Sequence, residues 1–435
     1  MTLPRVKDHG AAPLSGKERR LLLLLGVPSA GLSLCLTVLS TYLPLLARRF
    51  TSSTAIIGLL VGGEGLIAVL IPVWVGSLSD RTDTRFGRRL PFLLATAPIA
   101  ALALGLVPFA PSLPVMAVEV FFFYLAYFTY FAPYQALYPD LVSKGASGRA
   151  QGIQGVFSNA GLGCALVGGG LLLGLWRPLP YLVAAATLPL GTAVLVLGLR
   201  GSTRARTAPD RDRRSPSAEL RALLRGHPDI RNFVVGNALL MLALGGLKSF
   251  VVLWLTEGLG KSMTFTAGAM TVVALGTVVG AIVAGKLADT LGTAHVLSIA
   301  LTVFGVGLAV GTFSRSVVIL GAAFPIIALS GGAAIALPYA LLMRLMPSGS
   351  HGTVAGLYDV SSGVGTLLGP AITGVAIDLL HPLFASTHGY AAMWPVLSVS
   401  VLASTVILRR AGALTQRPGS LSSPSNRGPS GTQRR

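Results

Sequence analysis

The chain has 435 residues, of which 52% are hydrophobic and only 11% are charged. So few charges cannot cover a water-soluble surface, and this excludes a soluble enzyme or a soluble binding domain. The net charge of +19 comes from basic residues near the ends of apolar segments, so we expect no nucleic-acid partner.

Apolar runs long enough to cross a bilayer, about 20 residues each, recur along the chain. They predict an all-α membrane protein with roughly twelve transmembrane helices. The predicted helices are residues 21–47, 55–77, 90–110, 113–137, 151–175, 179–199, 230–257, 265–285, 295–314, 317–343, 353–380 and 390–410. Lys and Arg gather in alternate connections and in both terminal stretches. This pattern predicts a cell-membrane protein with both termini in the cytoplasm.

A polar stretch divides the predicted helices into two groups of six. The predicted parts are a cytoplasmic amino terminus at 1–20, a first bundle at 21–199, a cytoplasmic linker at 200–229, a second bundle at 230–410 and a disordered cytoplasmic tail at 411–435. Residues 1–20 lead straight into a full-length span, which is not the pattern of a cleavable signal peptide. Within the linker, Ala218–Arg225 has apolar residues at helical spacing and is predicted to lie along the membrane surface.

Polar side chains follow one face of the first predicted helix and recur on the seventh. Ser33 and Thr37 share a stripe on the first helix, and Asn237 lies on the seventh. Such faces are typical of a watery cavity, so these three residues are predicted to contact a substrate. The alternative is that the Ser and Thr hydroxyls bond to their own helix backbone.

Ionisable residues are rare inside the predicted helices, because a charge within the bilayer is costly. Three of them, Glu64, Lys248 and Asp359, are predicted to take part in coupling. At a rise of about 1.5 Å per residue, Glu64 and Lys248 lie at a similar depth in opposite halves and can pair. We expect protonation of Glu64 to release this pair as the halves move. The alternative is a permanent ion pair that holds helices together.

The fourth predicted helix carries the candidate substrate surface. Its members follow steps of four, four, three and four residues, which puts them in one stripe: Glu119, Phe123, Tyr127, Tyr130 and Tyr134. Aromatic faces stack on sugar rings, while phenol and carboxylate groups bond to hydroxyls, so the stripe suits an uncharged polyol. The alternative is an aromatic helix that faces lipid or packs internally.

Two motifs resemble those of a known transporter family. The hairpin Gly76–Arg89, G-S-L-S-D-R-T-D-T-R-F-G-R-R, resembles the signature between helices 2 and 3 of the major facilitator superfamily. Within it, the hairpin and P-Y-Q-A-L-Y-P-D (Pro133–Asp140) look like the glycoside-pentoside-hexuronide:cation symporters and the related sucrose transporters. The resemblance lies mainly in the amino-terminal half. It implies two pseudo-symmetric six-helix bundles, the major facilitator fold, and a secondary active transporter that moves a sugar or glycoside by alternating access.

The resemblance also implies that the hairpin locks the two halves together on the cytoplasmic side. A weaker copy of the hairpin, G-K-L-A-D, ends at Asp289. The residues of this predicted cytoplasmic gate are Asp80, Arg81, Arg85, Gly87, Arg88, Arg89 and Asp289. For the arginines, the alternative is that they only mark the topology.

The chain departs from the sodium-coupled symporters, whose helix carboxylates are replaced here by Pro72, Ala68 and Phe131. We therefore expect coupling to protons. A proton-driven exporter of drugs or metabolites and a passive facilitator are the alternatives. Exporters of the superfamily carry Gly-Pro on helix 5, where Gly161–Gly170 lacks the Pro, and this favours uptake.

Glycine pairs at four-residue spacing suggest close, sliding contacts between the halves. They are Gly58 and Gly62, Gly170 and Gly174, Gly276 and Gly280, and Gly365 and Gly369. No catalytic motif, metal site or cofactor site is predicted. The expected partners are the lipid bilayer, protons and a small sugar or glycoside, and the expected state is a monomer.

Overall fold

The computed structural model describes residues 16–82, 84, 87–142, 147–199, 226–314, 316–345 and 351–415. Most of the predicted tail, linker and amino terminus, together with Arg85, lies outside these ranges, while residues 411–415 of the predicted tail are helical. The first half contains α1 (Gly16–Ala47), α2 (Thr54–Arg81), α3 (Leu90–Leu106), η1 (Val107–Phe109), α4 (Leu113–Leu141), α5 (Ser147–Leu175) and α6 (Leu179–Leu199). The second half contains α8 (Pro228–Leu253), η3 (Trp254–Gly258), α9 (Met263–Leu291), α10 (Thr293–Phe313), α11 (Val317–Leu345), α12 (His351–Leu379), η4 (Ala385–Thr387), η5 (Tyr390–Ala392) and α13 (Met393–Thr415).

The predicted fold class is confirmed. Twelve helices in the described ranges are long and apolar enough to cross a membrane, and these ranges contain no β-strand. Several helices run past the predicted ends, as α2 does to Arg81 and α4 to Leu141. The reason is that hydrophobicity marks only the part inside the bilayer, whereas backbone hydrogen bonding continues into the polar residues beyond it. The hairpin between α2 and α3 is therefore shorter than its motif.

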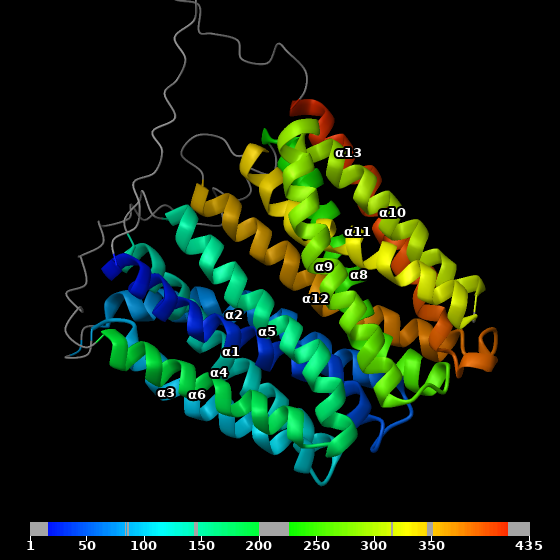
Figure 1. The fold of residues 1–435 in the computed structure, drawn as a ribbon, viewed down its shortest axis with the longest axis horizontal. Helices are drawn as coiled ribbons and strands as arrows, with labels where there is room; N and C mark the ends of the chain where they lie inside the picture. Colours follow the sequence, from blue (N-terminus) through cyan, green and yellow to red (C-terminus); the bar gives the residue numbers. More distant parts are fainter. Residues whose placement is uncertain are drawn as a thin grey trace, which may run out of the picture.

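The helices form two bundles with the same internal arrangement. The N-bundle, α1–α6, and the C-bundle, α8–α13, lie side by side in Figure 1, coloured blue to green and green to red. In the N-bundle α1 packs against α5 and α6, α3 against α4 and α6, and α2 against α4. In the C-bundle the matching helices make the matching contacts: α8 with α12 and α13, α10 with α11 and α13, and α9 with α11. The two bundles are thus structural repeats.

The contacts between the bundles obey the same symmetry. The repeat matches α2 to α9 and α5 to α12. Under this matching the α5–α9 contact is the counterpart of the α2–α12 contact, which is the larger of the two. A smaller contact joins α1 to α8, the first helices of the two repeats. We call the end with the α2–α3 connection, residues 82–89, the hairpin end. The opposite end, with the α1–α2 connection at residues 48–53, is the Arg48 end.

Close packing between α2 and α12 depends on glycine. A Cβ atom on Gly58 would overlap the carbonyl oxygen of Pro370, and one on Gly374 would overlap the carbonyl oxygen of Thr54. The two helix backbones therefore touch at positions where any side chain would separate them.

The predicted glycine contacts are confirmed for two helices and wrong for two. Gly58 and Gly62 face α12, and Gly170 faces Ala267 of α9, so these contacts do join the bundles. The pairs on α9 and α12 instead face helices of their own bundle: Gly276 and Gly280 face α11, while Gly365 and Gly369 face α8. Spacing identifies a close approach, but it cannot tell which of several neighbouring helices makes it.

We predict that Gly58→Ala destabilises the protein, because the added methyl group forces α2 and α12 apart. Overpacking of this kind costs about 1–3 kcal/mol. Gly63→Ala is the matched control, since a Cβ at Gly63 has no atom within 4 Å. Thermal unfolding of the purified variants, followed by intrinsic fluorescence, should show a lower midpoint for Gly58→Ala alone. Equal midpoints for both variants would contradict the prediction.

Candidate functional site

A cavity of about 200 Å³ lies between the two bundles. Its walls come from α1 and α5 on one side and from α8, α9, α10, α11 and α13 on the other. Most of its described lining is apolar, and the polar members are Thr37, Thr41, Lys248, Thr277 and Trp394. Lys248 is the one charged residue in this described lining. Of the predicted site residues, Thr37 and Lys248 line the cavity.

Two polar atoms in the cavity lining lack a hydrogen-bond partner. They are Oγ1 of Thr41 and the indole Nε1 of Trp394, on side chains that are 1% and 2% exposed. A buried polar group without a partner costs about 1–3 kcal/mol, so such groups are uncommon and call for an explanation. Their place in the lining of a cavity between the bundles makes them candidate ligand contacts.

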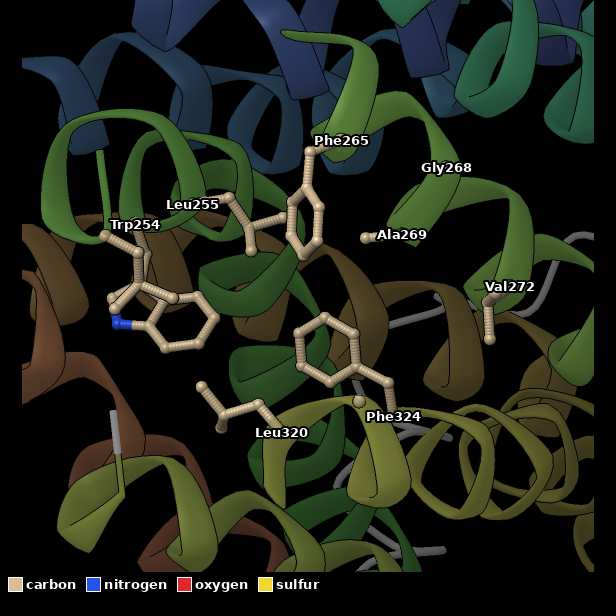
Figure 2. Close-up of a pocket in the computed structure, with 10 residues that line it drawn as sticks. Trp254, Leu255, Phe265, Gly268, Ala269, Val272, Leu320 and Phe324 are labelled. Atoms are coloured by element: carbon tan, nitrogen blue, oxygen red, sulfur yellow. The ribbon is translucent and has the colours of Figure 1, made fainter. Parts of the chain in front are cut away.

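A second, apolar pocket of about 320 Å³ adjoins the central cavity. Figure 2 shows the side chains of Trp254, Leu255, Phe265, Leu320 and Phe324 converging on it. Phe324 lines both spaces, and the ring of Trp254 packs edge-on against Trp394 of the central cavity, with their centroids 4.8 Å apart. The two spaces therefore share Phe324 as a wall residue, and we call the second one the side pocket.

Glu64 of α2 and Lys248 of α8 approach one another across the bundle interface. Both side chains are partly buried, and their charges interact. The charge of Glu64 also acts on the hydroxyls of Tyr124 and Tyr127 of α4. The described residues include ion pairs between Arg48 and Glu257 and between Arg89 and Asp140, but none between Glu64 and Lys248. Their proximity was expected, and their role in coupling stays a prediction.

The aromatic stripe of α4 lies inside the N-bundle. Phe123, Tyr127, Tyr130 and Tyr134 are each at most 4% exposed, and none is in the described lining of the central cavity. The Tyr134 hydroxyl donates to the carbonyl of Leu25 at 2.5 Å and also bonds to the Ser29 hydroxyl, while Tyr130 bonds to Thr192 at 2.9 Å. This is the internal packing that the sequence left open as an alternative. Substrate contact by the stripe stays a prediction.

The remaining predicted substrate and coupling residues are dispersed. Glu119 is partly buried, with Oε2 lacking a partner, and Ser33 is partly buried on α1. The Asn237 amide donates to Ser361 and Ser362 at 2.8 and 3.0 Å, which ties α8 to α12 inside the C-bundle. Asp359 is exposed on α12. The structure thus brings together Glu64, Lys248 and Thr37 near the bundle interface, but not the other members of this set.

The hairpin and the second motif contact each other. Nε of Arg89 forms an ion pair with Oδ2 of Asp140 at 3.2 Å, and Nη1 of Arg89 donates to the Ser79 hydroxyl at 2.5 Å. Asp140 is the last residue of the motif at the end of α4, so Arg89 joins α2, α3 and α4 of the N-bundle. Gly87 has φ +87°, a conformation that favours glycine in the turn.

The other predicted gate residues lie at the same end of the molecule. Arg81 is exposed, Arg88 is partly buried and Asp289 is exposed on α9, while the side chain of Asp80 lies outside the described part of the chain. The ion pair that the structure describes at this end is internal to the N-bundle. A lock between the halves formed by the hairpin therefore stays a prediction.

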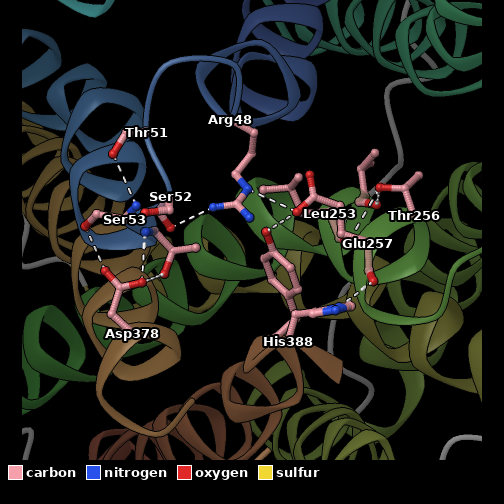
Figure 3. A network of polar contacts seen from close by, with 12 residues as sticks. Arg48, Thr51, Ser52, Ser53, Leu253, Thr256, Glu257, Asp378 and His388 are labelled. Atoms are coloured by element: carbon pink, nitrogen blue, oxygen red, sulfur yellow. Dashed lines mark hydrogen bonds and ion pairs between the residues drawn. The ribbon is translucent and has the colours of Figure 1, made fainter. Parts of the chain in front are cut away.

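The Arg48 end carries a polar cluster that the sequence did not reveal (Figure 3). Nε of Arg48 forms an ion pair with Oε2 of Glu257 at 3.0 Å, and Tyr390 donates to the same oxygen at 2.7 Å. Arg48 also donates to the carbonyl of Ser52 at 2.6 Å. Since Arg48 follows α1 whereas Glu257 and Tyr390 belong to the C-bundle, the cluster joins the bundles.

A second contact at this end is a helix cap supplied by the other bundle. Asp378, near the end of α12, accepts from the backbone N–H of Thr54 and of Ala55 at 2.9 and 3.0 Å. It also accepts from the hydroxyls of Ser53 and Thr54 at 2.8 and 2.6 Å. The carboxylate thus satisfies the free N–H groups at the start of α2 and faces the positive end of its dipole. An acidic residue at the end of a span was the available signal, but nothing in the sequence identified a partner more than 300 residues away.

The fold and the cavity define a class of protein, namely a multi-pass membrane protein built from two six-helix repeats with a space between them. The family model of the Major Facilitator Superfamily matches residues 29–268 and 233–430. The chain belongs to this superfamily. This is the superfamily that the hairpin resembles.

The similar proteins add the fold but no finer identity. Part of the chain is 31% identical over 150 residues to an uncharacterised MFS-type transporter found in two strains of Mycobacterium tuberculosis. The match covers 34% of this chain, which spans only 21% of the length of those relatives. A bacterial homologue of the human lysosomal transporter Spinster, in an inward-facing and unoccupied conformation, has a TM-score of 0.69 at 18% identity over 93% of this chain and 97% of its own. The nucleoside transporter NupG has a TM-score of 0.67 at 15% identity over 92% and 99%.

We predict that Asp140→Asn lowers the thermal-unfolding midpoint, because it removes the negative charge of the Arg89–Asp140 ion pair. The side chains of Arg89 and Asp140 are only 9% and 17% exposed, and breaking a buried pair costs on the order of 3 kcal/mol. Asp289→Asn, at an exposed carboxylate of α9, is the control and should leave the midpoint unchanged. If both substitutions shift the midpoint equally, the Arg89–Asp140 pair does not stabilise the N-bundle.

We predict that Arg48→Gln and Glu257→Gln each widen the Arg48 end, since either change removes the ion pair between the bundles. Spin labels at Leu175→Cys and Leu383→Cys, both strongly exposed, report the distance across this end in a background without Cys35 and Cys164. Pulsed electron resonance should show a larger population at long distances in either variant.

The control for this measurement is Arg49→Gln, because Arg49 donates to the carbonyl of Pro108 within the N-bundle. Its distance distribution should match that of the labelled parent. A distribution unchanged by all three substitutions would show that the Arg48 cluster does not hold the bundles together.

Proposed function

We propose that this protein is a proton-coupled secondary active transporter that imports a small organic solute. The observation that carries the proposal is the pair of Glu64 and Lys248, which stand on different bundles and interact across the interface. A charge pair between moving parts is a natural coupling element, because its strength depends on both the relative position of the bundles and the protonation of the acid.

The coupling follows from simple electrostatics. Ionised Glu64 attracts Lys248 and holds α2 toward α8, whereas protonated Glu64 loses this attraction and frees the lysine charge. The groups that face Glu64 are Lys248 from α8 and the phenols of Tyr124 and Tyr127 from α4. No charged side chain of α1 or α12 in the described ranges interacts with it. Binding or release of one proton therefore changes the net charge between the bundles by a full unit.

The Arg48 cluster and the Asp378 cap suit a second gate, at the end of the molecule opposite the hairpin end. Both join the bundles at the Arg48 end, and both consist of polar contacts that separate without disturbing the core of either bundle. The distribution of Lys and Arg supports a cell-membrane location with the hairpin end and both termini in the cytoplasm. In this arrangement the contacts described at the Arg48 end close the extracellular side. We further propose that the monomer is the transporting unit, since the cavity lies within one chain.

Two observations bear on the class of cargo. The hairpin and the Pro133–Asp140 motif support a sugar or glycoside, as in the transporters that they resemble. The central cavity supports a cargo with more apolar surface, because most of its described lining is apolar. Uptake of both kinds of probe is therefore the appropriate test.

We predict that Glu64→Gln abolishes proton-driven accumulation. Right-side-out membrane vesicles with an acidic exterior should concentrate at least one of two probes, sucrose or hexanesulfonate, only when Glu64 is present. Glu18→Gln, which removes an exposed carboxylate at the start of α1, is the control and should accumulate the probe like the parent. Full accumulation by Glu64→Gln would disprove the coupling role. An exporter would instead load only inverted vesicles, and a facilitator would equilibrate each probe without concentrating it.

A further inference from the structure

The polar side chains in the described lining of the central cavity are one lysine, one tryptophan and three threonines. Lys248 and Trp394 carry donors and no acceptor, and the Thr41 hydroxyl can donate. Nε1 of Trp394 and Oγ1 of Thr41 are buried and have no hydrogen-bond partner. No Asp or Glu is in the described lining. A lining with one cation and no carboxylate matches an oxyanion such as a carboxylate or a sulfonate.

The rest of the cavity is suited to an apolar group. Leu162 and Leu166 of α5 line one side, and the C-bundle residues Leu247, Met270 and Phe324 line the other. Behind Phe324 lies the side pocket of about 320 Å³, with Trp254 and Phe265 in its wall. A solute bound at Lys248 would therefore bring its remaining atoms against apolar surface, where hydrocarbon is favoured over hydroxyl-bearing groups.

The carboxylate of Glu64 would compete with an anionic solute for Lys248. When Glu64 is ionised, its negative charge on α2 stabilises the positive charge of Lys248. When Glu64 is protonated, Lys248 is left as an uncompensated charge beside an apolar cavity, which is costly unless another anion replaces the carboxylate. Proton and anion would then bind together, because each relieves the charge imbalance that the other creates.

We propose that the cargo is an amphipathic organic anion, whose anionic head binds Lys248 and whose apolar part fills the cavity toward Phe324. The proposal rests on the proposed transport function and narrows its cargo to one chemical class. It makes Lys248 the residue that determines specificity for charge.

The test is equilibrium binding to the purified full chain in lipid nanodiscs at constant pH, measured by calorimetry and by tryptophan fluorescence. The probes are hexanesulfonate, which has both parts, methanesulfonate, which lacks the apolar part, and hexyl glucoside and sucrose, which lack the charge. Hexanesulfonate should bind at least tenfold more tightly than each of the other three. Tighter binding of hexyl glucoside or sucrose would overturn the proposal and favour a sugar.

Lys248→Met should weaken hexanesulfonate binding at least tenfold and should remove its preference over hexyl glucoside. Lys286→Met, at an exposed lysine of α9, is the matched control and should bind all four probes like the parent. Unchanged hexanesulfonate affinity in Lys248→Met would refute the role of the lysine.

Glu64→Gln keeps the test informative if Lys248→Met does not fold. It should bind hexanesulfonate more tightly than the parent, because the competing carboxylate is gone, and equal or weaker binding would count against the competition. Binding is measured without a proton gradient. A failure to bind hexanesulfonate would therefore contradict only the proposed class of cargo. If hexanesulfonate binds but is not accumulated in response to a proton gradient, the proposed proton coupling is contradicted instead.

Discussion

The backbone contact between α2 and α12 is the constraint on which the rest of the structure depends. Gly58 and Gly374 allow the two helices to touch without intervening side chains. The symmetry-related contact of α5 with α9 also brings the two bundles close together. Together these contacts hold the bundles at a short distance along two lines. Because α2 is held so close to the C-bundle, Glu64 comes within electrostatic reach of Lys248.

Two regions of the interface differ in whether their buried polar groups have hydrogen-bond partners. At the Arg48 end, the carboxylates of Glu257 and Asp378 each accept from several donors. The polar groups at this end therefore have hydrogen-bond partners when the bundles are together. In the cavity, the donors of Trp394 and Thr41 have no partner. A protein tolerates the cost of unsatisfied groups where a ligand or a moving part supplies the missing partner. The first pattern fits a gate and the second fits a binding site.

Much of the architecture could be predicted from the sequence, but less of the site. The twelve helices followed from apolar runs, and the proximity of Glu64 and Lys248 followed from their matched depth. The aromatic stripe shows the limit of this reasoning. Helical spacing correctly placed Tyr130 and Tyr134 on one face, but it carried no information about what covers that face, which turned out to be α1 and α6 of the same bundle.

The sequence by itself determined the helix count, the repeat of two six-helix bundles and the family, because hydrophobic length and a local motif are properties of neighbouring residues. Only the tertiary structure decided that Arg48 meets Glu257, that Asp378 caps α2, and that Lys248 shares a cavity with Trp394. These partners lie far apart along the chain and are brought together by the crossing of whole helices. Their meeting depends on the rotation and depth of each helix within its bundle, and no local pattern of residues encodes these two quantities.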